Sequence, residues 1–146
     1  MNMASSPQAS AGVCDVNWLL DNFVAETDGV EQAIGVSSDG LLMAISTPSL
    51  NRAEADRLAA MISGMMSLAL SASRVLGKGA LRQVITEFGQ GYLLVSAISG
   101  GSCLGVVTPS QCDLGLVGYQ STVLVQRIGA LLTPELITEL KASLVL

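Results

Sequence analysis

The chain has 146 residues, of which 50% are hydrophobic and 13% charged, and its formal net charge is −5. This length fits one domain with a sizeable core, and the acidic balance argues against nucleic acid or an anionic lipid surface as a partner, because both attract clustered Lys and Arg. The mean hydropathy of +0.56 is high for a soluble monomer. It fits either a well-packed small core or, the interpretation that we favour, an apolar surface that another protein chain covers.

The N-terminal segment lacks the features of an export signal. Residues 1–12 contain neither a positively charged start nor a continuous apolar run, so we expect a disordered leader followed by one domain at 13–146. Asp15 is a suitable N-cap for a first helix, and Asp28-Gly29 is expected to end it. The apolar stripe of this helix consists of Val16, Leu19, Leu20, Phe23 and Val24.

Two strands joined by a tight turn are predicted next. The segments 30–36 and 41–46 are apolar and flank Asp39-Gly40, a pair that readily adopts the positive φ of a hairpin turn. Thr47-Pro48-Ser49 ends the second strand, because Pro supplies no N–H group to a β-ladder.

The segment 51–76 is predicted to form a long helix with two faces that both need burial. Asn51 with Glu54 resembles a capping box, and Gly77 suits a left-handed C-cap. One face carries larger apolar residues at helical spacing, namely Leu58, Met61, Ile62, Met65, Ala69, Ala72 and Leu76. The other carries small residues that allow another backbone to approach closely, namely Ala60, Gly64, Ser67 and Ser71. Since a small domain has one core to offer, we expect a second copy of the chain to cover the other face.

The same helix is not expected to enter a membrane. Ser63, Gly64 and Ser67 interrupt it, so it falls short of the roughly 18 unbroken apolar residues of a membrane span.

The second half of the chain is predicted to contain three strands and two helices. The strands are expected at 80–88, 92–98 and 103–107, with Pro109 ending the last one. Asp113 caps a helix at 114–132, and Thr133-Pro134 starts a short final helix. The core-facing residues of the longer helix are expected to be Leu116, Val117, Val123, Leu124 and Ile128. Short connections make the sheet antiparallel, in the order α-β-β-α-β-β-β-α plus a C-terminal helix.

The sequence contains no recognisable catalytic, cofactor-binding or metal-binding site. It has no histidine, which removes the commonest general base and metal ligand. Gly77-Lys78-Gly79 lacks the further glycine and the Ser/Thr of a phosphate loop, and we interpret it as a helix end. The three cysteines form no CxxC motif and are expected to be reduced thiols of a cytoplasmic protein, with Cys103 in the core.

Several stretches together resemble the bacterial, actinobacterial-type roadblock/dynein light chain domain. Their order and spacing carry the resemblance over nearly all of residues 15–140. The stretches are Trp18-Leu19-Leu20-Asp21, Ser37-Ser38-Asp39-Gly40-Leu41-Leu42, residues 53–73, Arg82-Gln83-Val84, Gly91-Tyr92-Leu93-Leu94-Val95, Gly101-Ser102-Cys103-Leu104 and Asp113-Leu114-Gly115-Leu116-Val117. The resemblance implies a profilin/roadblock-like α/β fold of the α+β type, with a five-stranded antiparallel sheet sandwiched by helices.

The resemblance also implies a homodimer without enzymatic activity or cofactor. Two protomers would join through the long helix and the strand after it, which adds Val84 and Thr86 to an interface made of Ala60, Gly64, Ser67 and Ser71. The family's dimers act as platforms, so one expected partner is a small Ras-like GTPase in a signalling system. The alternative is a structural adaptor or sensor module that assembles a sensor histidine kinase or another protein complex without a GTPase.

Overall fold

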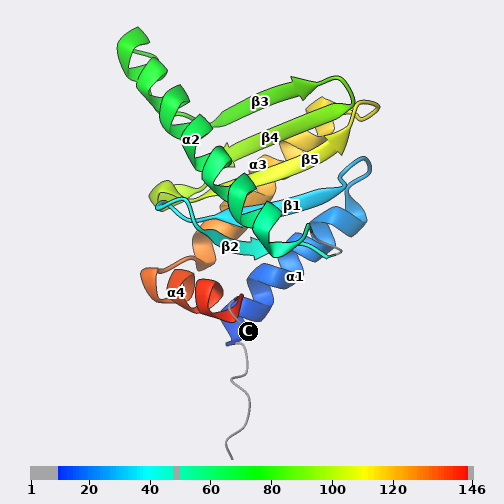
Figure 1. The fold of residues 1–146 in the computed structure, drawn as a ribbon, viewed down its shortest axis with the longest axis vertical. Coiled ribbons are helices and arrows are strands. Elements are labelled where there is room, and N and C mark those ends of the chain that lie inside the picture. Colours follow the sequence, from blue (N-terminus) through cyan, green and yellow to red (C-terminus); the bar gives the residue numbers. More distant parts are fainter. Residues whose placement is uncertain (1–9, 48–49, 145–146) are drawn as a thin grey trace, which may run out of the picture.

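The computed structural model describes residues 10–47 and 50–144. In that part of the chain, the α-helices are Ala11–Glu26 (α1), Arg52–Leu76 (α2), Leu114–Leu131 (α3) and Pro134–Ser143 (α4). The strands are Gln32–Val36 (β1), Leu42–Ile45 (β2), Gln83–Phe88 (β3), Gly91–Ala97 (β4) and Cys103–Pro109 (β5), with a 3₁₀ turn at Ser99–Gly101 (η1). The predicted order of elements is confirmed (Figure 1).

The strands form one antiparallel sheet in the order β2-β1-β5-β4-β3. Helices cover both faces of it. Side chains that alternate along the strands, such as Leu93 and Leu94, belong to two separate apolar cores. One core joins the sheet to α1, α3 and α4, and the other joins it to α2. The five-stranded sandwich expected from the sequence is therefore the observed architecture.

Local hydrogen bonds explain where most helices begin and end. Each of three predicted caps accepts a backbone N–H: Asn51 from Glu54 at 2.9 Å, Asp113 from Leu116 at 3.1 Å and Thr133 from Leu136 at 3.0 Å. Gly77 ends α2 with φ of 66°, the left-handed conformation that a Schellman-type ending needs.

The start of α1 was predicted too late. The structure begins the helix at Ala11, because the Ser10 hydroxyl accepts the N–H of Val13 at 3.2 Å and so supplies the cap in place of Asp15. The last part of the predicted leader 1–12 is therefore helical. Its first nine residues, and the Pro48-Ser49 break, lie outside the described residues.

Two strand boundaries also differ from those predicted. β3 begins at Gln83 rather than residue 80, because Gly79 has φ of 86° and the chain enters the sheet only after this turn. β5 continues to Pro109. The proline sits opposite Gly91 at the end of the β4–β5 ladder, where its missing N–H costs the sheet little.

The two edges of the sheet differ in their surroundings. Helix α4 contacts β2 and α1, and its Leu140 is fully buried, so this helix flanks the β2 edge. β3, at the opposite edge, pairs with β4 alone among the strands that the structure describes. Figure 1 shows the C-terminal half of α2 continuing past this edge strand.

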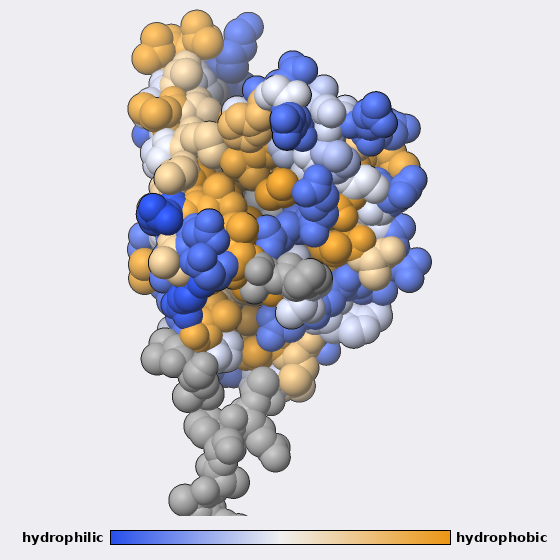
Figure 2. All heavy atoms as spheres, turned by 45° about the vertical axis from the view of Figure 1, so that its right-hand side comes forward, coloured by the Kyte–Doolittle hydropathy of each residue, from blue (hydrophilic) through white to orange (hydrophobic). Residues whose placement is uncertain are grey.

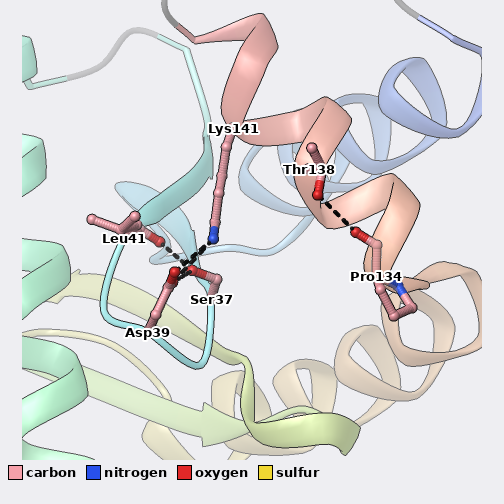
Figure 3. Close-up of polar contacts among 6 residues, drawn as sticks. All are labelled: Ser37, Asp39, Leu41, Pro134, Thr138 and Lys141. Atoms are coloured by element: carbon pink, nitrogen blue, oxygen red, sulfur yellow. Dashed lines mark hydrogen bonds and ion pairs between the residues drawn. The ribbon is translucent and has the colours of Figure 1, made fainter.

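An ion pair fastens α4 to the β1–β2 turn. The ammonium of Lys141 lies 2.8 Å from Asp39 Oδ2 and 3.1 Å from Oδ1, and the Ser37 hydroxyl donates to the same carboxylate (Figure 3). The hydrogen bonds from Lys141 and Ser37 lower the pKa of Asp39 from 3.8 to about 2. Lys141 and Asp39 are 102 residues apart in the sequence, so the pair connects the C-terminal helix to the first hairpin.

We predict that this pair adds stability at neutral pH and not in acid. The pKa of Asp39 is lower in the folded chain than in the unfolded chain, so the contribution is complete above about pH 4 and is lost as the pH falls toward about 2. Thermal unfolding of Lys141→Met against the unchanged protein measures it. The difference in Tm should be small, because both side chains are partly solvated, and it should disappear at the acid end. A difference that stays constant from pH 7 to pH 2 would contradict the assignment.

We predict that Gly91 tolerates no side chain whereas Gly89, in the same hairpin, does. A Cβ at Gly91 would overlap the backbone carbonyl oxygen of Thr108 in the neighbouring strand, but a Cβ at Gly89 meets no atom within 4 Å. Gly91→Ala should lower the free energy of unfolding by about 1–3 kcal/mol, as overpacking does, and Gly89→Ala should change it by less than about 0.5 kcal/mol. Urea unfolding of the two variants provides the comparison, and equal losses would refute it.

Candidate protein-interaction surface

Helix α2 is mostly exposed: three of its 25 residues are buried. Its buried residues are Ala55, Ala59 and Ile62, all in the half that lies on the sheet. Beyond Met65, the exposed fractions of Leu68, Val75 and Leu76 are 75%, 86% and 66%. Hydrophobic residues run along this helix at the upper left of Figure 2. Within one protomer the sheet buries one face of the first half of α2, because the sheet ends before the helix does. Burial of the other face by a second copy stays a prediction.

The predicted interface residues are accessible in the single chain. Ala60, Gly64, Ser67 and Ser71 are all exposed, and a Cβ at Gly64 would meet no atom within 4 Å. Val84 and Thr86 are half-buried on the α2 face of β3, where the Thr86 hydroxyl lies 3.9 Å from the Met65 sulfur. The structure thus brings the helix and strand parts of the predicted interface together along one edge of the sheet. Their use by a second copy stays a prediction.

By length and composition alone, α2 would also be long and apolar enough to cross a membrane. This differs from the sequence interpretation, in which three small residues interrupt the apolar run. Only 11% of its most apolar window is buried in the single chain. Arg52, Asp56 and Arg57 charge its first turns, and Ala55 and Ile62 anchor the same half to the sheet. These features favour a helix whose exposed side is covered by another protein over a helix that spans a membrane.

A shallow groove of about 300 Å³ lies beside α2 on the same face of the sheet. Its floor comes from the far ends of β3, β4 and β5, and Leu58 of α2 forms one wall. The main apolar side chains in it are Leu58, Phe88, Leu93 and Val107, and Glu31 lies at its rim. Phe88 is 55% exposed, so the groove has an apolar surface that this protomer leaves uncovered.

A second apolar surface lies on the opposite face of the sheet. Ile85 pairs with Leu94, which packs in the α3 core, so Ile85 points to the α3 side of the edge strand. It is 51% exposed, and Tyr119 on α3 is 65% exposed. Leu116 was predicted to face the core but is 44% exposed, because Val117, Ser121, Leu124 and Ile128 form the inward stripe of α3.

Sequence reasoning did not identify Ile85 and Tyr119 as surface residues. Alternation along β3 gave a usable signal, since Val84 and Thr86 take the α2 face and leave Ile85 to the other. The signal for Tyr119 was its position next to, but outside, the apolar stripe of α3.

Ionisable side chains are spread over the surface rather than gathered in a site. Among residues 10–47 and 50–144, no three His, Cys, Asp or Glu side chains lie close enough to hold a metal ion. Cys103 is buried as predicted, and burial raises the pKa of its thiol to about 11. Its thiol is therefore protonated and unreactive at neutral pH. The features that stand out on the described part of the molecule are exposed apolar surfaces, which are typical of protein-interaction sites.

Comparisons with known proteins agree with this architecture. A family model described as the Roadblock/LC7 domain matches residues 16–108. A solved Roadblock/LC7 domain from Streptomyces avermitilis has 33% sequence identity and a TM-score of 0.72, covering 77% of this chain and 92% of that one. No curated protein matches at a significant level.

Two more distant structures share the fold. The gliding protein MglB from Thermus thermophilus has 16% identity and a TM-score of 0.74, covering 87% of this chain and 97% of its own. Profilin IB from Acanthamoeba castellanii has 18% identity and a TM-score of 0.55, covering 78% and 96%. At these identities the likeness concerns the fold alone. The family model and the Streptomyces structure together establish that the chain belongs to the Roadblock/LC7 domain family.

Proposed function

We propose that the protein is a homodimeric regulatory platform that binds a small Ras-like GTPase in a cytoplasmic signalling system. The single observation that carries this proposal is that a Roadblock/LC7 domain has apolar surfaces on both faces of one open sheet edge. A protein with such surfaces acts by holding other proteins. Nothing in the described residues supplies an activated nucleophile or a general base paired with a substrate pocket.

The dimer forms at the β3 edge. An unpaired edge strand offers a row of backbone N–H and C=O groups, and an identical strand related by a two-fold axis satisfies them by antiparallel pairing. Helix α2 extends past this edge and would lie over the sheet of the partner. The β2 edge is unsuitable because α4 flanks it.

The GTPase binds on the opposite face of the merged sheet. Pairing through β3 places the two Ile85 side chains near the two-fold axis, between the α3 helices of the two protomers. Leu116 and Tyr119 border this surface from each side. One GTPase lying across the axis excludes a second, so we propose two roadblock chains for each GTPase. The GTP-bound state is preferred, because the γ-phosphate orders the switch loops that such a surface contacts.

Recovery of the partner from native extract tests the proposal. An affinity-tagged protein should capture a small GTPase, and more of it with a non-hydrolysable GTP analogue than with GDP. Recovery of a kinase complex without any GTPase would support the adaptor alternative and overturn the proposal. A wild-type protein that sediments as a monomer at micromolar concentration would overturn the dimer.

We predict that Tyr119→Ala weakens binding of the recovered GTPase by about 10-fold, the loss typical of a central aromatic residue at an interface. Gln120→Ala, the next residue of the same helix, is the control, since Gln120 borders α1 on the side of α3 away from β3. Calorimetry with the GTP-analogue complex measures both. Equal affinities for Tyr119→Ala and Gln120→Ala would show that the GTPase binds elsewhere.

Any increase in GTP hydrolysis should come from positioning the switch loops rather than from a donated arginine. Arg52 pairs with Asp56 at 2.9 Å and also donates to the Leu144 carbonyl, and Arg57, Arg74 and Arg127 lie within helices. Arg82 was predicted within a strand, but it lies in the loop before β3. Because a donated arginine needs a loop, Arg82 is the strongest candidate for an arginine finger.

We predict that each single Arg→Ala variant keeps hydrolysis within about 10-fold of the unchanged protein. An arginine finger contributes at least about 10³-fold, so the two mechanisms are well separated. Single-turnover hydrolysis by the recovered GTPase, with saturating variant, makes the measurement. A ~10³-fold loss for Arg82→Ala with unchanged binding would identify a finger.

A further inference from the structure

We propose that a hollow between α3 and the start of β3 receives an acidic side chain of the bound GTPase, with Arg82, Ser96 and Gln126 as its hydrogen-bond donors. The inference rests on the proposed function and deepens it, because it assigns the chemistry of one contact with the partner protein. The hollow has a volume of about 610 Å³ and lies on the α3 face of the sheet, the face opposite α2. The apolar side chains in its wall are Leu81, Ala97 and Val125.

The hollow adjoins the surface proposed for the GTPase. Gln83 lines it and lies two residues before Ile85 in β3, so both side chains point to the α3 face of the strand, about 7 Å apart. Thr122 lines it from α3, about one turn beyond Tyr119. A protein that covers Ile85 and Tyr119 therefore also borders the hollow.

The backbone that carries Arg82 is fixed at both ends of its loop. The Ser73 hydroxyl donates to the Gly79 carbonyl at 2.6 Å, which ties the loop to α2. The Arg82 carbonyl accepts the N–H of Ala97 at 2.8 Å, which ties the other end of the loop to β4. The Arg82 side chain is exposed and forms no ion pair with the described residues. Its guanidinium is thus held beside the hollow and is free to bind a carboxylate.

The hollow offers further hydrogen-bond donors. The side-chain amide of Gln83 donates to Ser96 Oγ at 3.1 Å and to the Gly118 carbonyl at 3.4 Å. Ser96 is 2% exposed and accepts from Gln83, so its own hydroxyl hydrogen is left without an acceptor among the described residues. Gln126 adds an exposed amide from α3. An ionised carboxylate only accepts hydrogen bonds, so it complements this set of donors.

The charge around the hollow favours an anion. No Asp or Glu lines it. In the sequence, residues 57–86 contain four basic residues and no acidic one, although the net charge of the chain is −5. The acidic residue of β3, Glu87, lies at the other end of the strand, roughly 13 Å along it from Gln83. This end of the sheet edge therefore selects an acidic side chain over a basic one.

Charge reversal at two arginines tests the contact. Arg82→Glu and Arg127→Glu change the net charge equally, but Arg127 borders α1 on the side of α3 away from β3. Calorimetry with the recovered GTPase should show an affinity at least ~100-fold weaker for Arg82→Glu, because two carboxylates then meet, and within about 3-fold of the unchanged protein for Arg127→Glu. Arg82→Lys keeps the charge but loses the paired N–H groups, so its affinity should be roughly 10-fold weaker. Circular dichroism melting checks that each variant folds.

A compensating change identifies the carboxylate. One Asp→Lys or Glu→Lys substitution on the surface of the GTPase should restore its affinity for Arg82→Glu to within about 10-fold of the original pair. If no such substitution restores binding, the inference is wrong.

Sedimentation velocity separates this contact from a contact between protomers. The dimer dissociation constants of Arg82→Glu and Arg127→Glu should agree within about 3-fold. A dimer that only Arg82→Glu weakens would assign the occupant of the hollow to the second copy and overturn the inference.

Failure of the inference is distinct from failure of the proposed function. If native extract yields no GTPase, both fail. If a GTPase is captured and Tyr119→Ala weakens its binding, but Arg82→Glu and Arg127→Glu bind it equally, the proposed function stands and the inference alone fails.

Discussion

Helix α2 is longer than the sheet on which it rests, and most of the exposed apolar surface on that side of the molecule follows from this mismatch. Its first half buries Ala55, Ala59 and Ile62 against the sheet in the usual way. Its second half continues past the edge strand (Figure 1), and Leu68, Val75 and Leu76 are exposed there. At roughly 25 cal/mol per Å² of apolar area removed from water, leaving several Leu, Val and Met side chains exposed forgoes several kcal/mol that a second chain would recover.

The two edges of the sheet differ, and only one of them is open to a further strand. Helix α4 flanks the β2 edge, where Leu140 is buried and Lys141 pairs with Asp39 across the first hairpin. The β3 edge keeps its outward backbone groups unpaired within the described chain. Growth of the sheet is therefore possible at one edge, and this is the edge that α2 crosses. In the proposed dimer, the open strand and the projecting helix at this boundary meet the same elements of a second copy.

The described residues contain no cluster of ionisable side chains that could hold a metal ion. The ion pairs that the structure describes are partly solvated: Arg52–Asp56 lies within α2, and Lys141–Asp39 fastens α4 to the first hairpin. Burial raises the pKa of the Cys103 thiol and so holds it in the protonated form. In the proposed function, regulation acts through the arrangement of the partner proteins. In the proposed dimer, α2 joins the protomers on one face and leaves Ile85 and Tyr119 free on the other.

The sequence by itself determined the features that depend on near neighbours. Asn51, Asp113 and Thr133 cap helices because each side chain accepts an N–H three residues ahead, and Gly77 ends α2 because glycine adopts a positive φ without strain. These interactions span a few residues, so the order of helices and strands could be predicted from spacing alone. The antiparallel sheet followed from the short connections.

Tertiary structure alone decided which side of each element is buried. Periodicity showed two candidate faces of α2, but only the width of the sheet determines that the second half of the helix is left uncovered. Ser121 rather than Leu116 faces the core, because the direction in which α3 crosses the sheet selects its inward stripe. The ion pair between Asp39 and Lys141 joins positions 102 residues apart, a distance over which local pattern carries no information. Burial depends on residues remote in sequence, and those neighbours exist only once the chain has folded.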